Sequence, residues 1–391
     1  MHVKKNIILK HGKEASLKRF HPWVFSGAIA KAEEGLAEGA LVKVISSSGD
    51  FLGIGHYQTG SIAVRIISFE DCLIGTAFWK LKLEMAVFLR RSAGLDSNVF
   101  RLVHGEGDGL PGLIVDFYDG VAVFQAHSVG MYLIRNEISM LLKEIMGDSL
   151  RAVYDKSAKT LPFKADLNPC DGYLLGTADK GVVKEYEYSF EVDWVEGQKT
   201  GFFVDQRENR KLVEKYSSGR DVLNMFCYSG GFSFYALGGG ANSVHSVDAS
   251  AKAIELTNKN MELNFHGDTR HQSFVADAAT FMQNIKDKYD LIILDPPAFA
   301  KHRDALHQAL QAYKRLNIKA FEQIRSGGIL FTFSCSQVVP KDKFREAIFS
   351  AAAISGRSVK ILHQLSQPSD HPVNIYHPEG EYLKGLVLYV D

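Results

Sequence analysis

Hydrophobic residues in the first 70 positions fall into short runs that turn-forming sequences separate. Residues 41–46 (LVKVIS) and 61–68 (SIAVRIIS) are rich in valine and isoleucine, which favour strands. A turn signal, SGD at 48–50, stands between them. Short strands with glycine turns are typical of a small barrel or sandwich, so we expect a β domain over residues 1–70.

The next block, residues 71–185, combines helical and strand patterns. Residues 76–91 and 131–146 place apolar side chains three or four positions apart, which predicts two amphipathic helices. Apolar runs on both sides of Asp119-Gly120 predict a β-hairpin. Strands and helices in this irregular order are typical of an α+β domain. The apolar residues that share one face of the first helix are Phe78, Leu81, Met85 and Phe88.

From Asp221 onwards, apolar strand runs alternate with helical segments. Runs such as DVLNMF (221–226) and DLIILD (290–295) are mostly apolar on both sides, which is typical of strands buried on two faces. This alternation predicts a parallel sheet covered by helices on both faces. We therefore expect an α/β domain over residues 186–391.

The charge balance limits the classes of partner. The 391 residues include 45 Lys+Arg and 45 Asp+Glu, so the net charge is zero and a globally basic nucleic-acid coat protein is excluded. The first 20 residues are nevertheless basic and contain a single acid, Glu14. Such a cluster is either a solvated face or a surface for nucleic-acid phosphates. Its basic residues are Lys4, Lys5, Lys10, Lys13, Lys18 and Arg19.

Cysteine spacing and hydropathy predict the compartment. Cys72, Cys170, Cys227 and Cys335 are far apart and form no CxxC pair, which argues against a structural zinc site and a disulfide framework. The chain has no run of 18 apolar residues, and its first 20 residues lack the apolar stretch of a signal peptide. We therefore expect a cytoplasmic protein without membrane association.

Glycines and acidic residues follow successive strands of the α/β block. The loop after the first strand is FCYSGGFS (226–233), and Asp248 and Asp277 end the next two strands. Because the carboxyl ends of parallel strands share one edge of a sheet, we expect these residues to lie together. Asp248 can hold both hydroxyls of a ribose, and Asp277 can accept a hydrogen bond from an adenine amino group. NAD and S-adenosylmethionine both fit these features.

The composition of the loop favours S-adenosylmethionine over NAD. NAD-binding loops use G-x-G-x-x-G, whose middle glycine admits a pyrophosphate, and that spacing is absent here. Phe226 and Tyr228 make the loop bulky, which a cofactor without phosphates tolerates. An NAD oxidoreductase is therefore disfavoured.

A DPPAF sequence (295–299) follows the fourth strand. Pro296 and Pro297 form a rigid platform, Asp295 can bond a ring nitrogen or an amino group, and Phe299 can stack on a base. Methyltransferases that act on amino groups carry D/N-P-P-Y/F, so the aromatic residue here stands one position late. That difference weighs against exocyclic-amine chemistry.

Cys335 ends the following strand and is a candidate nucleophile. Methylation of a pyrimidine at C5 needs one, because that carbon is not nucleophilic enough on its own. A thiolate that adds to C6 makes C5 enamine-like, so that C5 can attack a sulfonium methyl group. The alternative is that Cys335, like most free cysteines, is a small buried hydrophobic residue.

The sequence resembles the RlmI-type family of 23S rRNA cytosine-C5 methyltransferases. The resemblance spans essentially the whole chain, so it is more specific than any single motif. The sequences that carry it are RFHPWVFSGAI (19–29), DGLPGLIVDFY (108–118), QKTGFFVDQR (198–207), NMFCYSGGFS (224–233), DPPAF (295–299), FSCS (333–336) and HPEGEYLKGL (377–386).

The resemblance implies three domains: a PUA domain over residues 1–70, a central α+β domain over 71–185, and a Rossmann-like class I methyltransferase domain over 186–391 with an antiparallel last strand. It also implies that Cys335 is the nucleophile and that Asp295 orients the base. The implied cofactor is S-adenosylmethionine, and the implied partner is 23S rRNA or a precursor of the large subunit. The oligomeric state stays open, a homodimer included.

One position departs from the wider group of RNA cytosine-C5 methyltransferases. Those enzymes carry a second cysteine in the loop after the DPP aspartate, used for product release, and this chain has Ala298 there. Alanine fits the RlmI type and leaves open which base removes the C5 proton. One relative lacks the thiol and methylates guanine, so fold resemblance alone would not identify the base.

The expected site combines residues from several segments of the chain. The cofactor-binding residues are Asn224, Phe226, Tyr228, Gly230, Asp248, Ser250, Asp277, Ala278 and Asp295, with Phe203, Gln206 and Arg207 from the preceding segment. The RNA-binding residues are Lys199, Pro296, Pro297, Phe299, Lys4, Lys5 and Arg19. We expect the segment 197–207 to fold over cofactor and base, with Lys199 and Arg207 near an RNA phosphate or the cofactor carboxylate. We expect no metal site, because His371 and His377 stand without nearby cysteines or paired acids.

Two other functions stay open. The first is an RNA methyltransferase that acts on a base nitrogen, with Cys335 merely structural. The second is a non-catalytic RNA-binding factor for ribosome assembly. A product assay on cytosine-labelled RNA separates the first from C5 methylation, and a lack of S-adenosylmethionine binding would favour the second.

Overall fold

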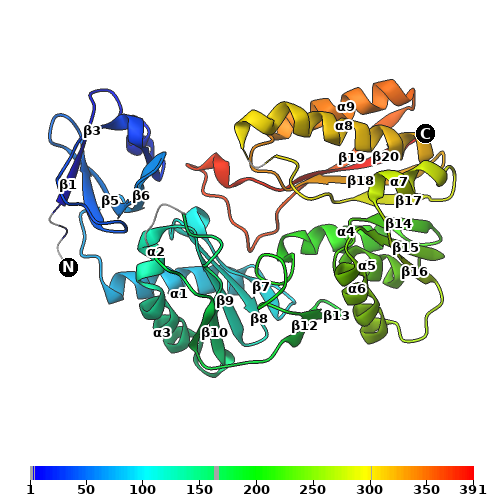
Figure 1. Cartoon of the computed structure of the whole chain (residues 1–391), viewed down its shortest axis with the longest axis horizontal. Coiled ribbons are helices and arrows are strands. Elements are labelled where there is room, and N and C mark those ends of the chain that lie inside the picture. Colours follow the sequence, from blue (N-terminus) through cyan, green and yellow to red (C-terminus); the bar gives the residue numbers. More distant parts are fainter. Residues whose placement is uncertain (1–2, 4, 163–166, 301) are drawn as a thin grey trace. The chain divides into compact units, whose positions relative to one another are not determined.

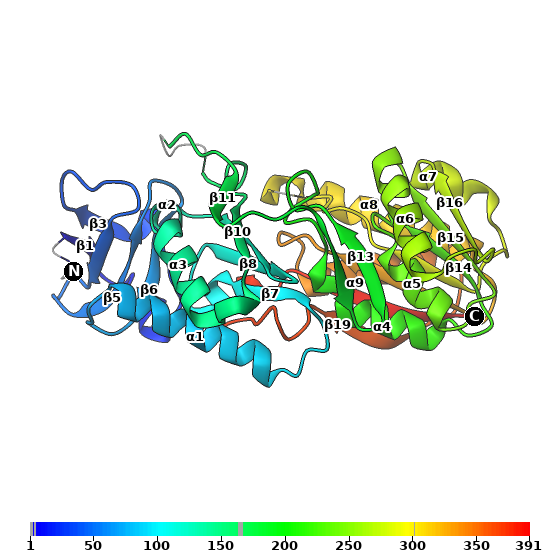
Figure 2. The ribbon, with the colours of Figure 1, turned by 90° about the horizontal axis from the view of Figure 1, so that it is seen from below.

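The computed structural model describes residue 3 and residues 5–162, 167–300 and 302–391 (Figures 1 and 2). Lys4, which we expected to bind RNA, lies outside the described residues. The chain folds into two compact units. The first unit comprises Met1–Val183, Val192–Phe202 and Ser369–Gly380, and the second comprises Lys184–Glu191, Phe203–Pro368 and Glu381–Asp391. Each unit is therefore built from three separate segments of the chain.

The N-terminal part of the first unit is a β domain, as the sequence predicts. Its described residues form a six-stranded sheet in the order β2-β6-β5-β4-β1-β3. Val42 and Val44 of β4 are buried while the residues on either side of each are partly exposed, which is the two-residue period of a strand. At Gly55 an added Cβ would lie 2.3 Å from the carbonyl oxygen of Arg65, so glycine alone permits this close pairing. The strands are β1 (Lys5–Leu9), β2 (Trp23–Phe25), β3 (Ile29–Ala32), β4 (Leu41–Ile45), β5 (Phe51–Tyr57) and β6 (Ile62–Ser68).

The rest of the first unit is an α+β arrangement whose described residues include a five-stranded sheet in the order β11-β10-β9-β8-β7. The predicted hairpin is confirmed as the antiparallel pair β8–β9. The strands are β7 (Val99–His104), β8 (Leu113–Tyr118), β9 (Val121–Ala126), β10 (Ala152–Asp155) and β11 (Gly172–Leu175). The helices are α1 (Thr76–Ser92), α2 (Val129–Leu133) and α3 (Arg135–Met146).

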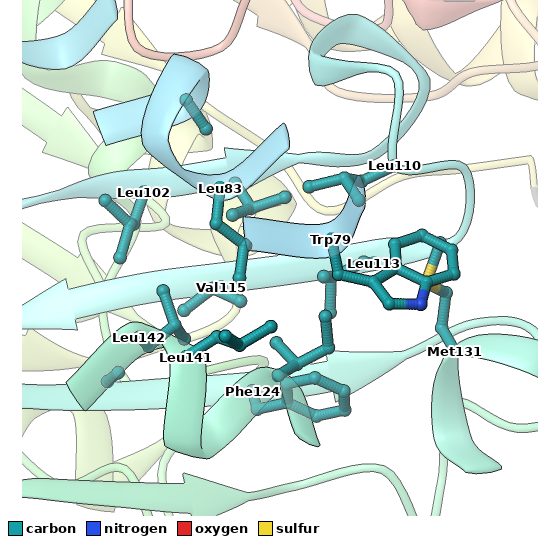
Figure 3. Packing of buried hydrophobic residues seen from close by; sticks show 14 of the residues in the cluster. Trp79, Leu83, Leu102, Leu110, Leu113, Val115, Phe124, Met131, Leu141 and Leu142 are labelled. Atoms are coloured by element: carbon teal, nitrogen blue, oxygen red, sulfur yellow. The ribbon is translucent and has the colours of Figure 1, made fainter. Parts of the chain in front are cut away.

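Helices α1 and α3 pack on this sheet through buried apolar side chains. Figure 3 shows Trp79 and Leu83 of α1 and Leu141 of α3 directed towards strand residues such as Val115. All four side chains are almost fully buried. Their packing forms one continuous hydrophobic core for this part of the unit.

The apolar face that the sequence predicts for α1 is largely exposed in the structure. Leu81 is 56% exposed and Phe88 is 71% exposed, whereas Arg90 is buried. The Arg90 guanidinium is tolerated in the interior because its Nη2 donates to Asp108 Oδ2 (2.8 Å) and to the carbonyl oxygen of Asp370 (2.7 Å). A paired arginine thus takes a core position, which a pattern of apolar residues cannot anticipate.

The second unit contains the predicted α/β domain. Its described residues form a seven-stranded sheet in the order β16-β15-β14-β17-β18-β20-β19, with helices on both faces (Figure 1). The strands are β14 (Asp221–Met225), β15 (Ser243–Asp248), β16 (His271–Val275), β17 (Leu291–Leu294), β18 (Gly328–Ser334), β19 (Val359–Ser366) and β20 (Lys384–Val390). The helices are α4 (Arg207–Tyr216), α5 (Gly231–Gly238), α6 (Ala251–Asn264), α7 (Ala278–Phe281), α8 (Leu306–Gln323) and α9 (Lys341–Ser355).

Strand directions in this sheet follow the expected Rossmann-like pattern. Strands β14 to β18 pair in parallel, and β20 is antiparallel to both β18 and β19, so the expected antiparallel last strand is confirmed. The strand order reverses between β14 and β17, which makes a topological switch point at their carboxyl ends. A short two-stranded sheet, β12 (Gly181–Glu185) with β13 (Tyr188–Val192), precedes this domain along the chain. Within the described residues, no helix has the length and apolar character needed to cross a bilayer.

Candidate cofactor and catalytic site

The loop after β14 has an unusual backbone. Phe226 and Tyr228 both adopt positive φ values, 61° and 47°, which side chains other than glycine rarely do. Such strained residues cluster at ligand-binding sites, where the surrounding structure must hold them in place. The Tyr228 carbonyl accepts a hydrogen bond from Thr257 Oγ1 (2.9 Å), which contributes to that hold. Sequence reasoning assigned the loop to the cofactor without anticipating this strain.

Asp248 ends β15 beside the same loop. Its Oδ2 accepts from the Tyr228 amide (3.0 Å) and its Oδ1 from the Ser250 amide (2.9 Å). These two bonds fix the carboxylate in place, and its remaining lone pairs leave capacity for hydroxyl donors. Ser250 caps α6, with its Oγ accepting from Ala253 N (3.3 Å). The geometry fits a ribose, the group for which Asp248 was predicted.

Asp277 follows β16 and is exposed. Its Oδ1 accepts from the amide of Thr280 (3.0 Å), which lowers the pKa of the carboxyl group, as does the bond from the Thr280 hydroxyl. Asp277 therefore caps α7 and stays ionised, while Ala278 beside it is half-buried. A capping role does not use all acceptor sites of the carboxylate, so adenine recognition stays a prediction.

Two predicted cofactor residues have packing roles in the structure. Asn224 is fully buried on β14, where its amide donates to Ser233 Oγ (2.9 Å) and its Oδ1 has no hydrogen-bond partner among the described residues. Gly230 has φ of 81°, and an added Cβ would lie 2.6 Å from the ring of Phe234. The glycine is thus required for packing of the turn against α5, whether or not a ligand approaches it.

The segment before α4 is only partly placed as expected. The Phe203 ring lies edge-on to Tyr228, with centroids 5.1 Å apart, so the segment does reach the loop after β14. The Gln206 side chain is buried and accepts from Asn209 Nδ2 (2.6 Å). Arg207 is also fully buried, with its Nε 3.3 Å from Glu208 Oε1, and its expected contact with an RNA phosphate or the cofactor carboxylate stays a prediction. Lys199 is exposed but belongs to the first unit.

The candidate nucleophile lies against the DPPAF loop. The Cys335 sulfur is 3.9 Å from the carbonyl oxygen of Pro296 and is partly exposed. The two loops are also joined by Ser336, whose Oγ donates to the Ala300 carbonyl (2.7 Å). Because β17 and β18 are adjacent parallel strands, Asp295 and Cys335 end neighbouring strands at one sheet edge. The structure therefore brings together the two residues that were predicted to carry the chemistry.

The aromatic ring of DPPAF, Phe299, packs against another residue of the protein. Phe299 packs on Tyr313 of α8 with ring centroids 4.7 Å apart, while Pro297 is exposed and Pro296 is buried. Burial raises the pKa of the Tyr313 hydroxyl to about 12, so it stays protonated. Pro297 is therefore more accessible to a base than Pro296 or Phe299.

Cys227, the other cysteine near the site, is in a different environment. It is buried, and burial raises the pKa of its thiol to about 12. The Cys227 sulfur lies 3.7 Å from Thr257 Oγ1. A thiol held in its neutral form is a poor nucleophile, so the contrast with the partly exposed Cys335 favours a structural role for Cys227.

Sequence reasoning missed Lys384, the first residue of β20. Its side chain is buried, and its Nζ donates to the carbonyl oxygens of Ser336 (2.6 Å) and Val339 (2.7 Å). Both carbonyls belong to the loop that follows Cys335. The available signal was the lysine that opens an otherwise apolar strand, KGLVLYV (384–390).

The predicted RNA-binding residues of the N-terminal domain are near its surface. Arg19 is exposed, as is Lys18, which was not among the predicted residues, and Phe20 and Phe25 are about half exposed. The Lys5 side chain also stabilises the domain itself, because its Nζ donates to the carbonyl oxygens of Glu34 (3.2 Å) and Gly35 (2.5 Å). The sequence predicted the positive charge of this surface but not its exposed aromatic side chains.

The two histidines expected to be structural differ in their surroundings. His371 is buried 3.0 Å from Asp370 Oδ1. His377 is buried against the Trp23 ring, with centroids 4.3 Å apart, and its Nε2 is 3.8 Å from Glu379 Oε2. His21 Nε2 is 3.3 Å from the same carboxylate, so an acid does stand beside His377, contrary to expectation. The amide of Trp23 donates to His21 Nδ1 (3.2 Å), which leaves the proton of a neutral His21 on Nε2, facing Glu379.

Two parts of the chain match models of known protein families. Residues 7–69 match the model of a PUA-like domain, and residues 169–381 match that of an S-adenosylmethionine-dependent methyltransferase. Ribosomal RNA large subunit methyltransferase I of Alteromonas mediterranea is 39% identical over 392 residues, which cover 98% of each chain. The protein of the same name from Escherichia coli O139:H28 is 35% identical over 395 residues, covering 98% of this chain and 99% of that one.

Solved structures agree on the fold. A protein from Streptococcus mutans, described as a SAM-dependent methyltransferase, superposes with a TM-score of 0.85 at 22% identity, over 99% of this chain and all of that one. The cofactor of this family is S-adenosylmethionine, and the Asp248 carboxylate keeps acceptor capacity for the hydroxyl groups of its ribose. The chain therefore belongs to the ribosomal RNA large subunit methyltransferase I family of S-adenosylmethionine-dependent methyltransferases.

Proposed function

We propose that this protein forms 5-methylcytosine in 23S ribosomal RNA through a covalent bond between Cys335 and C6 of the target base. The observation that carries the proposal is the position of the Cys335 sulfur, 3.9 Å from the Pro296 carbonyl and at the end of the strand next to Asp295. The large-subunit RNA substrate is the one named for the relatives that match over the full chain. Such a substrate would place the enzyme in the compartment that holds ribosomes.

The chemistry begins with the thiolate of Cys335. When it adds to C6, an S–C6 bond forms and the electrons of the C5–C6 double bond move to C5. S-adenosylmethionine, when bound, supplies a sulfonium methyl group that such a carbon can take. Loss of the C5 proton then restores the double bond and breaks the S–C6 bond, which returns the thiolate. Ala298 stands where a second cysteine would assist this release, so another base must remove the proton.

Asp295 has the position to orient the base. It follows β17 directly, and the rigid Pro296-Pro297 pair after it limits the directions its loop can take. Its carboxyl group would hold the N3/N4 edge of cytosine with one shared proton, located on Asp295 or on N3 as charge builds. The target must leave its base stack first, which costs a few kcal/mol and less in a loop than in a duplex.

The N-terminal domain would hold the RNA. Lys18 and Arg19 can neutralise phosphates, and the exposed rings of Phe20 and Phe25 can stack on unpaired bases. Each stacked base contributes about 1–3 kcal/mol in single-stranded RNA. The combination of positive charge with exposed aromatic rings supports RNA binding more strongly than the charge alone.

A mechanism-based trap tests the proposal. RNA with 5-fluorocytosine at the target position cannot lose its C5 substituent, so the wild-type enzyme should stay attached to it on a denaturing gel. Cys335→Ala, which cannot form the bond, is the matched control and should leave no attached RNA. Complete separation of wild-type protein and RNA would move the chemistry to a base nitrogen.

A further inference from the structure

A buried lysine stands beside the candidate nucleophile. Lys384 is 3% exposed, although lysine side chains are almost never buried without a partner. In the antiparallel pair β18–β20 it lies directly opposite Ser334, the residue before Cys335. The sheet register therefore places this lysine at the strand end from which the thiol projects.

The Lys384 side chain holds the loop that carries Cys335. Its Nζ donates to the carbonyl oxygens of Ser336 and Val339, at 2.6 and 2.7 Å, which ties together the two ends of a four-residue turn. Ser336 in turn donates to Ala300 at the end of the DPPAF loop. The backbone around the nucleophile is thus anchored from β20 on one side and from the DPPAF loop on the other.

The charge of Lys384 is sensitive to the thiol. Burial lowers the pKa of the ammonium to about 8, and a negative charge on Cys335 acts in the opposite direction, followed by the weaker effect of Glu381. Glu381 also pairs with Lys341, at 3.4 Å on a half-exposed surface. Tyr313 of α8, whose pKa burial raises to about 12, stays protonated, and both Cys335 and Asp295 are among the groups that act on it. Electrostatic coupling is mutual, so an ammonium that a thiolate stabilises must stabilise that thiolate equally.

We propose that Lys384 is a positioning residue for Cys335, which fixes the 335–339 loop and stabilises the cysteine in its thiolate form. The proposal rests on the proposed role of Cys335 as the nucleophile. Lys384 itself transfers no proton: the thiol proton leaves to solvent before attack, and at pH 7, below its pKa of about 8, the ammonium is mostly protonated. Its positive charge favours the thiolate both before addition to C6 and when the S–C6 bond breaks.

The experiment measures the reactivity of Cys335 in the full-length protein as a function of pH. Iodoacetamide alkylation of the peptide that contains Cys335 is quantified by mass spectrometry, which separates it from the other three cysteines. Lys384→Met removes the charge and the donors, Lys384→Gln removes the charge but keeps two N–H donors, and Lys384→Arg keeps the charge. Lys341→Met, which removes a half-exposed lysine paired with Glu381, is the control.

An opposite charge at close range lowers the pKa of an acid by about one to three units. We therefore expect the alkylation inflection to rise by at least about one pH unit in Lys384→Met and Lys384→Gln, with about tenfold slower alkylation at pH 7. Lys384→Arg and Lys341→Met should stay within about half a unit of wild type. Methylation should fall in parallel, while S-adenosylmethionine affinity by calorimetry should change by less than about twofold.

The results that overturn the proposal differ from those that overturn the proposed function. An unchanged alkylation profile in Lys384→Gln, in a protein whose thermal unfolding matches wild type, leaves Lys384 a purely structural residue even if methylation falls. If Lys384→Met does not fold, Lys384→Gln carries the decision. Normal methylation by Cys335→Ala would instead remove the nucleophile itself, whatever the alkylation data show.

Discussion

The Cys335 sulfur lies 3.9 Å from the backbone carbonyl oxygen of Pro296. This proximity joins the ends of two adjacent parallel strands, one carrying the thiol and the other the aspartate of DPPAF. A target base that meets the thiol with its C6 atom can therefore present its polar edge to the neighbouring strand end. Substitutions can test the thiol, the proposed cofactor-binding residues and the proposed RNA surface separately.

Cys335→Ala should abolish methylation and leave S-adenosylmethionine binding intact, because we assign the thiol to the base and not to the cofactor. Cys227→Ala should retain most activity and lose about 1 kcal/mol of stability, since it removes one buried sulfur from a packed region. Methyl incorporation into rRNA and calorimetric cofactor binding check both variants. Normal turnover by Cys335→Ala would contradict the assignment.

Asp248→Ala should weaken cofactor binding by about 1–3 kcal/mol, the usual cost of a lost charge-assisted hydrogen bond. Part of the loss would come through the loop, because Asp248 also accepts from the amides of Tyr228 and Ser250. Asp248→Asn keeps one acceptor oxygen and should lie between wild type and alanine. Calorimetry with S-adenosylhomocysteine measures all three, and equal affinities would exclude Asp248 from the site.

Arg19→Ala should weaken RNA binding and make it less sensitive to salt. Each lost phosphate contact reduces the slope of log affinity against log salt by about 0.7–0.9. Phe25→Ala should weaken binding by about 1–3 kcal/mol with little change in slope, because stacking involves no counterion release. Lys319→Ala, a surface lysine of α8 paired with Glu322, is the control. Salt titrations by fluorescence anisotropy distinguish the two effects, and wild-type affinity in both variants would argue against this RNA surface.

The protein should lose stability as the pH falls from 6.5 towards 4. Burial lowers the pKa of His56 and of His271 to about 4, so the unfolded chain binds more protons than the native one across this window. Each residue can contribute a loss of up to about 1.4 kcal/mol per pH unit. Urea unfolding at pH 7 and pH 5 measures the loss. His56→Gln, similar in size and unable to titrate, should show a smaller difference between the two pH values.

The sequence predicted the strand-end residues well because parallel strands bring their carboxyl ends together whatever the details of packing. Cys335 and Asp295 do follow neighbouring parallel strands, as expected, while their chemical roles stay predictions. The burial of polar side chains was not predicted. Arg207 reads as a surface cation, and its burial depends on partners that sequence spacing does not reveal.

The same limit explains the other differences. Asn224 is part of a buried hydrogen-bond chain with Ser233, which forms only when β14 and α5 pack together. Lys384 was overlooked because its two carbonyl partners lie 45 and 48 residues away along the chain. A single sequence indicates which residues can carry chemistry, but not which of them the fold uses to hold its loops.

Strand β20 completes the sheet by inserting between β18 and β19, and it is synthesised after both of these strands. During synthesis the PUA-like domain therefore emerges well before this sheet can close. Until residues 384–390 are translated, the Cys335 loop lacks its lysine anchor, and the edges of β18 and β19 are unpaired. The Lys384 bonds to the Cys335 loop can therefore form only after synthesis of the strand that carries the thiol.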